Sequence, residues 1–184
     1  MRKEYGKVLR QYFTKKMKER LPEFKAEKIK SVFIWPGQRA FCQVISDSLK
    51  YWIVLSPSPK DYDEFTVLIG WSTLGRYPEL TVIPSFLLPS PDRAEFSQAE
   101  YLARLPQLWT EKDVWWIVKA FEPALTVEQM TANMAPISVA VAEERVIPCV
   151  EDAIKKILDF GIPYLSEFVE SRFRRNMHNT GLSQ

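Results

Sequence analysis

Four short apolar runs between residues 30 and 71 constrain the fold of this chain most strongly. They occupy residues 30–35, 40–45, 51–55 and 65–71, and polar or turn-forming residues such as Pro36 and Gly37 separate them. Runs of this length that are rich in β-branched and aromatic residues are typical of β-strands. Because the intervening loops are short, we expect each strand to pair with the next in an antiparallel meander.

Amphipathic helices are predicted at both ends of the chain. In residues 3–21 an apolar side chain recurs every three or four positions, at Tyr5, Val8, Leu9, Tyr12, Phe13, Met17 and Leu21. Towards the carboxyl end, Pro148 suits the first turn of a helix, and we interpret Gly161 as the left-handed glycine that ends it. A second helix then covers residues 163–174. This order predicts an α+β fold, in which an antiparallel sheet of four to five strands packs against N- and C-terminal helices.

Between residues 74 and 134 the pattern predicts a loop, a helix, a strand and a short helix. Prolines favour a loop over residues 74–91, and apolar spacing favours a helix over residues 91–105. Residues 114–118 indicate a fifth strand, in which Trp115 and Trp116 point to opposite faces. One of these two tryptophans therefore needs cover from a helix, a loop or a partner. Thr126 and Gln129 have the spacing of a capping box, which predicts a short helix up to Met134.

The length and composition of the chain fit one globular domain. It has 184 residues, and 46% of them are hydrophobic. We predict a single α+β domain over residues 1–175 and a flexible tail over residues 176–184. The tail is polar and contains His178, the one histidine of the sequence.

Charge is distributed unevenly along the chain. The formal net charge of +2 combines +7 in residues 1–30, −8 in residues 31–171 and +3 in the last 13 residues. The basic N-terminal helix could hold phosphate groups of a nucleic acid, or it could be a solvated face. The sequence pI of about 8.5 lies below the values above 9 that are typical of nucleic-acid-binding domains. Nucleic acid is therefore the less favoured partner.

The sequence argues against several classes of site. Cys42, Cys149 and His178 do not have the spacing of a metal site or of a catalytic pair, and the six glycines are scattered singly. We therefore expect no metal and no cofactor. Since no apolar run approaches the roughly 20 residues of a membrane span and the N-terminus is charged, we expect a cytoplasmic protein with no membrane contact and with reduced thiols.

The loop around Asp61, Tyr62, Asp63 and Glu64 is the candidate binding site. It places three carboxylates beside one tyrosine between two predicted strands. Loops on a rigid sheet often carry binding residues, tyrosine gives a large contact area, and carboxylates steer a basic partner. Two alternatives stay open: a pair of these carboxylates could catalyse hydrolysis, or the loop could be only a solvated connection.

Several apolar segments resemble a bacterial domain-of-unknown-function family. They are Phe-Cys-Gln-Val-Ile at residues 41–45, Tyr-Trp-Ile-Val-Leu at 51–55, Phe-Thr-Val-Leu-Ile-Gly at 65–70 and Gly-Ile-Pro-Tyr-Leu at 161–165. The resemblance implies no catalytic residues, and proteins of this build are similar in character to immunity proteins that neutralise bacterial toxins.

The favoured function is therefore that of a non-catalytic binding protein, and more specifically of an immunity protein for a basic toxin. A nucleic-acid-binding protein that uses the basic helix and a carboxylate-dependent enzyme are the alternatives. The oligomeric state is left open.

Overall fold

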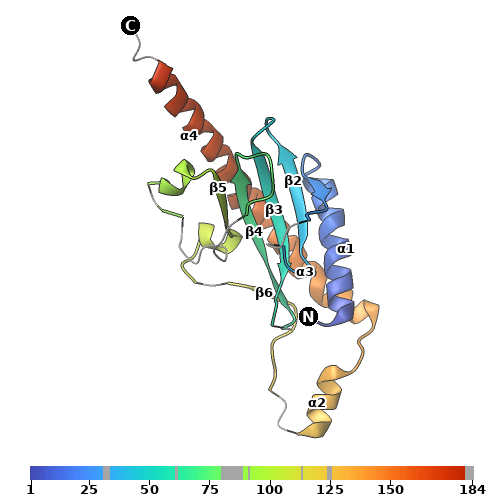
Figure 1. The fold of residues 1–184 in the computed structure, drawn as a ribbon. Helices are drawn as coiled ribbons and strands as arrows, with labels where there is room; N and C mark the ends of the chain where they lie inside the picture. The colour runs from blue at the N-terminus through green and yellow to red at the C-terminus, as the bar shows by residue number, and fades with distance from the viewer. Residues whose placement is uncertain are drawn as a thin grey trace.

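The computed structural model describes residues 1–30, 34–60, 62–79, 89–90, 92–112, 114–123 and 126–180, with residues 130, 132–134 and 172–180 described by their backbone alone. Helices flank a sheet along the chain (Figure 1). The helices are α1 (Lys3–Arg20), α2 (Val127–Met134), α3 (Val139–Lys156) and α4 (Ile162–Thr180). The strands are β1 (Lys25–Glu27), β2 (Arg39–Val44), β3 (Lys50–Pro57), β4 (Glu64–Ser72), β5 (Glu100–Arg104) and β6 (Trp116–Ile117). Three short helical segments complete the order: η1 (Ala94–Ser97), η2 (Leu105–Leu108) and η3 (Ile157–Gly161).

The strands form one six-stranded antiparallel sheet. Their order is β1-β2-β3-β4-β5, and β6 pairs with the first residues of β4. This arrangement confirms the predicted α+β fold. Gly70 on β4 lets β5 approach closely, because a Cβ atom at this position would lie 1.9 Å from the carbonyl oxygen of Tyr101.

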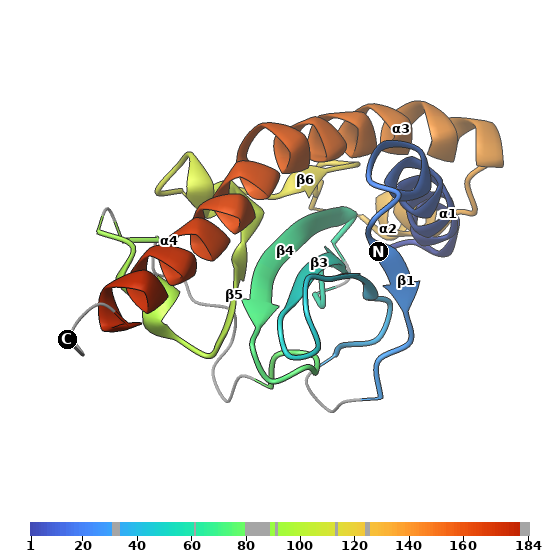
Figure 2. The same ribbon diagram turned by 90° about the horizontal axis from the view of Figure 1, so that it is seen from above.

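Both faces of the central strands are buried. Helices α1, α3 and α4 cover one face (Figure 2), where alternate residues of β4 enter the main core as Phe65, Val67, Ile69 and Trp71. On the other face a smaller apolar cluster forms around the strands, and its buried members are Ala40, Cys42, Trp52, Val54, Leu68, Tyr77 and Leu102. Burial on both faces explains why residues 51–55 are continuously apolar instead of alternating.

Helix α1 confirms the amphipathic pattern of the N-terminal segment. Its buried residues are Tyr5, Gly6, Val8, Leu9, Phe13 and Met17, which share one face of the helix. The face packs on the sheet and on α3, since Phe13 contacts the ring of Phe41 on β2 with 5.7 Å between centroids.

The prediction that Gly161 ends a helix is wrong. Helix α3 begins earlier than expected, at Val139, and Pro148 lies inside it. Ser138 is its N-cap, and the Ser138 hydroxyl accepts a hydrogen bond from the N–H of Val141. A π-helical turn, η3, then leads directly into α4, so that α3 and α4 form one long helix (Figure 2). Gly161 is buried because the helix passes close to the sheet there: an added Cβ atom would lie 2.6 Å from Ile69 Cδ1.

Other boundaries also differ from the predictions. The apolar spacing of residues 91–105 comes from η1 and strand β5, because pairing with β4 overrides the helical pattern. The strand expected at residues 30–35 falls partly on residues 31–33, which lie outside the described residues, and the strand beside β2 is β1. Helix α4 continues past residue 174 to Thr180, into the segment expected to be a tail.

The capping box is confirmed, and one of the two adjacent tryptophans has the expected cover, although Trp115 lies outside strand β6. Thr126 Oγ1 accepts the N–H of Gln129, and Gln129 Oε1 accepts the N–H of Thr126, as a capping box requires. Trp116 is buried under α3, where its Nε1–H donates to Asp152 at 2.9 Å. Trp115 is partly exposed, and the guanidinium of Arg104 lies over its ring.

Candidate functional site

Asp63, in the predicted binding loop, is buried and holds the start of helix α1. Its side chain is 9% exposed, and its Oδ1 accepts the backbone N–H of Arg2 at 2.7 Å. Its Oδ2 lies 2.9 Å from Arg2 Nε. A carboxylate is also favourable at a helix N-terminus because of the helix dipole. Asp63 is therefore engaged by the fold itself and is not available to steer a partner.

The other predicted residues of this loop are placed differently from Asp63. Asp61 lies outside the described residues. Glu64 is the first residue of β4, is half-buried and pairs with Ile117 of β6. Tyr62 is exposed, and its ring lies against that of Phe121, with 5.5 Å between centroids.

Tyr62, Ile117 and Phe121 form a group of exposed apolar side chains that we call the aromatic ridge. Their exposed fractions are 41%, 58% and 71%. The backbone brings them together, because the carbonyl oxygen of Asp63 accepts the N–H groups of Val118 and Lys119 at 2.8 and 3.1 Å. The rings of Tyr62 and Phe121 contact each other, and exposed apolar side chains that lie close together are typical of interaction surfaces. The sequence indicated Tyr62, but the loop that carries Phe121 gave no strand or helix pattern to predict its position.

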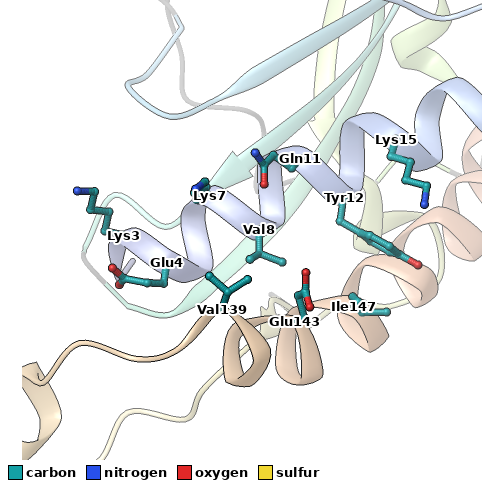
Figure 3. Close-up of a pocket in the computed structure, with 10 residues that line it drawn as sticks. All are labelled: Lys3, Glu4, Lys7, Val8, Gln11, Tyr12, Lys15, Val139, Glu143 and Ile147. Atoms are coloured by element: carbon teal, nitrogen blue, oxygen red, sulfur yellow. The ribbon is translucent and has the colours of Figure 1, made fainter.

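A groove of about 680 Å³ lies between α1 and α3 (Figure 3). Helix α1 provides Val8, Tyr12 and several polar residues, and α3 provides Val139 and Ile147. The polar residues that complete its lining are Lys3, Glu4, Lys7, Gln11, Lys15 and Glu143. We call this feature the α1–α3 groove. It was not predicted, because the sequence does not show which helices pack together.

One end of the α1–α3 groove is fixed by polar contacts. The hydroxyl of Tyr12 donates to Glu151 Oε1 at 2.5 Å, and Lys16 Nζ lies 2.9 Å from the same oxygen. The pKa of the Glu151 carboxyl is held below its usual range, mainly by the hydrogen bond from Tyr12 and to a smaller extent by the hydrogen bond from Lys16. Tyr12 is thus oriented by α3, and its ring forms a fixed wall of the groove.

Glu95 is a buried carboxylate that the sequence did not single out. Its Oε2 accepts the hydroxyl and the backbone N–H of Ser90 at 2.7 and 3.2 Å, and its Oε1 accepts the hydroxyl of Tyr164 at 2.9 Å. Burial is the main cause that raises the pKa of the Tyr164 hydroxyl, so this hydroxyl stays protonated and donates the hydrogen bond. Because both carboxylate oxygens accept hydrogen bonds from the protein, Glu95 joins the segment before β5 to α4.

The two cysteines are free, and the protein environment disfavours their thiolates. Burial raises the pKa of Cys42 to about 12 and also raises the pKa of Cys149. The side chain of His178 is not described. Among the described residues, no group of three or more His, Cys, Asp or Glu side chains could hold a metal ion. None of the helices in the described part of the chain is long and apolar enough to span a bilayer.

Comparisons of the chain with protein-family models, with curated proteins and with solved structures find no match. The resemblance to a domain-of-unknown-function family and to immunity proteins therefore stays a prediction.

Proposed function

We propose that the protein is a non-catalytic binding protein whose contact surface for a protein partner is the aromatic ridge. The observation that carries this proposal is the contact between the rings of Tyr62 and Phe121, which are tilted by 57° to each other and stay 41% and 71% exposed. Aromatic side chains are enriched among the residues that dominate binding energy, because they bury a large area at a small cost in entropy.

The ridge is supported by a rigid part of the fold. Tyr62 precedes Asp63, which is held by Arg2. Ile117 follows Trp116 in β6, and the Trp116 side chain donates a hydrogen bond to Asp152 of α3. Such support fixes the side chains before binding, so that little conformational entropy is lost in the complex.

The more specific proposal is that the partner is a basic bacterial toxin, which the protein neutralises. It is supported by the net charge of −8 in residues 31–171. Carboxylates also lie near the ridge: Glu64 is half-buried beside it, and the Glu122 side chain is 69% exposed. Complementary charge accelerates the encounter with a basic partner and discriminates against acidic ones.

Nucleic-acid binding through α1 receives less support, because several of the cations at this helix already have carboxylate partners. Arg2 pairs with Asp63, and Lys16 pairs with Glu151 and Glu19. A carboxylate-dependent enzyme that uses Asp63 is also less favoured, since Arg2 occupies both oxygens of that group.

The proposal is tested with the purified product of the gene immediately upstream, titrated calorimetrically against the full chain. We expect binding that Phe121→Ala weakens roughly 30-fold, as for loss of an interface residue worth about 2 kcal/mol. Trp35→Ala is the matched control, because Trp35 is an aromatic residue that is 48% exposed outside the ridge. Binding that is equally sensitive to both substitutions, or absence of binding, would contradict the proposal.

A further inference from the structure

We infer that the α1–α3 groove is a second binding site, which receives an amphipathic helix of another protein with carboxylates along one flank. This inference does not depend on the aromatic ridge. It rests on the arrangement of apolar and charged side chains in the groove, on its length and on the direction of the two helices that form it.

The lining residues follow three rows with a spacing of four residues. The outer row of α1 is Lys3, Lys7, Gln11 and Lys15, the inner row is Glu4, Val8 and Tyr12, and the row on α3 is Val139, Glu143 and Ile147. Residues four apart share one face of a helix and are separated by a rise of about 6 Å. The side chains that line the groove are therefore spaced like the side chains along one face of a helix that would lie in it.

The floor of the groove is mainly apolar, with Glu143 placed between Val139 and Ile147 (Figure 3). Val8, Val139 and Ile147 lie between the two helices, and Tyr12 reaches across to α3 (Figure 3). Val139 is 54% exposed although it occupies the first turn of α3. A stripe of aliphatic side chains on a bound helix would cover this floor, as in other complexes in which a helix occupies a groove.

The outer row on α1 is basic, and its charge is only partly compensated by carboxylates. Within the described residues, no carboxylate lies at ion-pair distance from Lys3 or Lys7, and Lys15 has only Glu19, at 3.9 Å. Carboxylates on the adjacent flank of a bound helix would complement this row. From Lys3 to Lys15 the row extends about 18 Å, which corresponds to a helix of about three turns.

Several features favour a protein helix over a nucleic acid. Glu4 and Glu143 line the same groove, and they would repel a strand that carries phosphates along its whole length. A helix can instead place its carboxylates on one flank and a lysine opposite Glu143. The floor also offers one aromatic ring, that of Tyr12, whereas nucleic-acid grooves commonly combine a basic track with several stacking rings.

The orientation of the bound helix also follows from the geometry. Helices α1 and α3 run in the same direction along the groove: α1 begins at Lys3 and α3 at Val139, and both continue towards the end at which Tyr12 and Ile147 lie (Figure 3). Their N-termini carry partial positive charge, and the C-terminus of a helix carries partial negative charge. The bound helix is therefore antiparallel to α1 and α3.

The test uses a synthetic 15-residue helical peptide with a leucine stripe, glutamates on one flank and lysines on the other, labelled with fluorescein. Binding to the full chain is measured by fluorescence anisotropy. We expect Lys7→Glu to weaken binding about tenfold or more, by loss of one ion pair and gain of a repulsion. Lys18→Glu is the matched control: it makes the same charge change at an exposed residue of α1 outside the groove, and it should alter binding less than about twofold.

Control ligands and a label separate the alternatives. Replacing the leucines of the peptide by glutamine, or its glutamates by lysine, should abolish binding. A nitroxide at its C-terminus should broaden the amide signals of Lys3 and Val139 more than that of Ile147. Equal effects of Lys7→Glu and Lys18→Glu, preferential binding of a 15-nucleotide single-stranded DNA, or self-association of the chain that Lys7→Glu abolishes would each overturn the inference.

Discussion

Replacing Asp63 by alanine tests whether this residue anchors helix α1 or serves as an exposed binding residue. The side chain is 9% exposed, accepts a hydrogen bond from the backbone N–H of Arg2 and forms an ion pair with the Arg2 guanidinium. Hydrogen bonds that involve a charged group contribute about 1.5–3 kcal/mol each, and their loss leaves the partner group with a desolvation cost. The Arg2 side chain is 23% exposed and regains some hydration, which reduces that cost.

We therefore expect Asp63→Ala to lower the free energy of unfolding by about 2 kcal/mol. For a chain of this size, that loss corresponds to a fall in Tm of about 4–8 °C. Urea unfolding followed by circular dichroism measures the change, and the m-value should stay constant. Amide exchange should accelerate in the first turn of α1 more than in its last turn.

A double-mutant cycle with Arg2→Ala separates the ion pair from other effects of the substitution. The two single losses should overlap, so that the double variant is more stable than their sum predicts. Asp159→Ala is the matched control, because Asp159 pairs with Lys155 at 2.6 Å on an exposed part of the helix and should be nearly neutral. A loss below about 0.5 kcal/mol for Asp63→Ala, or additive losses in the cycle, would refute the anchoring role.

Three further predictions concern the core. Gly161→Ala should lower the free energy of unfolding by about 1–2 kcal/mol in urea, because the new Cβ atom meets Ile69, and Ile69→Val should recover part of that loss. Burial raises the pKa of Tyr77 and Tyr101 to about 12, so stability should be complete below about pH 10 and fall as the pH rises towards 12, with absorbance at 295 nm reporting the ionisation. The Cys42 thiol, with a pKa of about 12, should resist Ellman's reagent at pH 8 in the folded protein and react after unfolding in urea.

The elements predicted best are those whose burial pattern is local. The apolar spacing within residues 3–21 and the continuous apolar run at residues 51–55 each indicate one element without reference to the rest of the chain. Both correspond to observed elements, α1 and β3. Residues 91–105 misled the prediction, since the apolar spacing of Tyr101 and Leu105 fits a helix while pairing with β4 makes a strand. Local propensity is a weak guide where a distant segment supplies the hydrogen bonds.

The candidate sites were only partly predictable for the same reason. The loop at residues 61–64 is visible in the sequence, but the buried state of Asp63 depends on Arg2, which lies 61 positions away. The α1–α3 groove combines residues more than a hundred positions apart. The exposure and the charge partners of these residues depend on how distant segments pack together. The sequence around each residue therefore does not reveal them.

Because of the π turn at residues 157–161, the number of residues in the C-terminal helical segment decides which side chains face the core. Buried residues run from Ala142 on α3 to Phe168 on α4, a span of 26 positions. Seven turns of 3.6 residues cover only about 25 positions, so one wider turn keeps both ends facing the sheet. The Ile162 N–H, which donates to the Ile157 carbonyl five residues back, marks that turn. Deleting one residue of this turn would rotate helix α4 by about 100° about its axis and turn Phe168 away from Trp71. Related proteins should therefore vary in the sequence of this turn more readily than in its length.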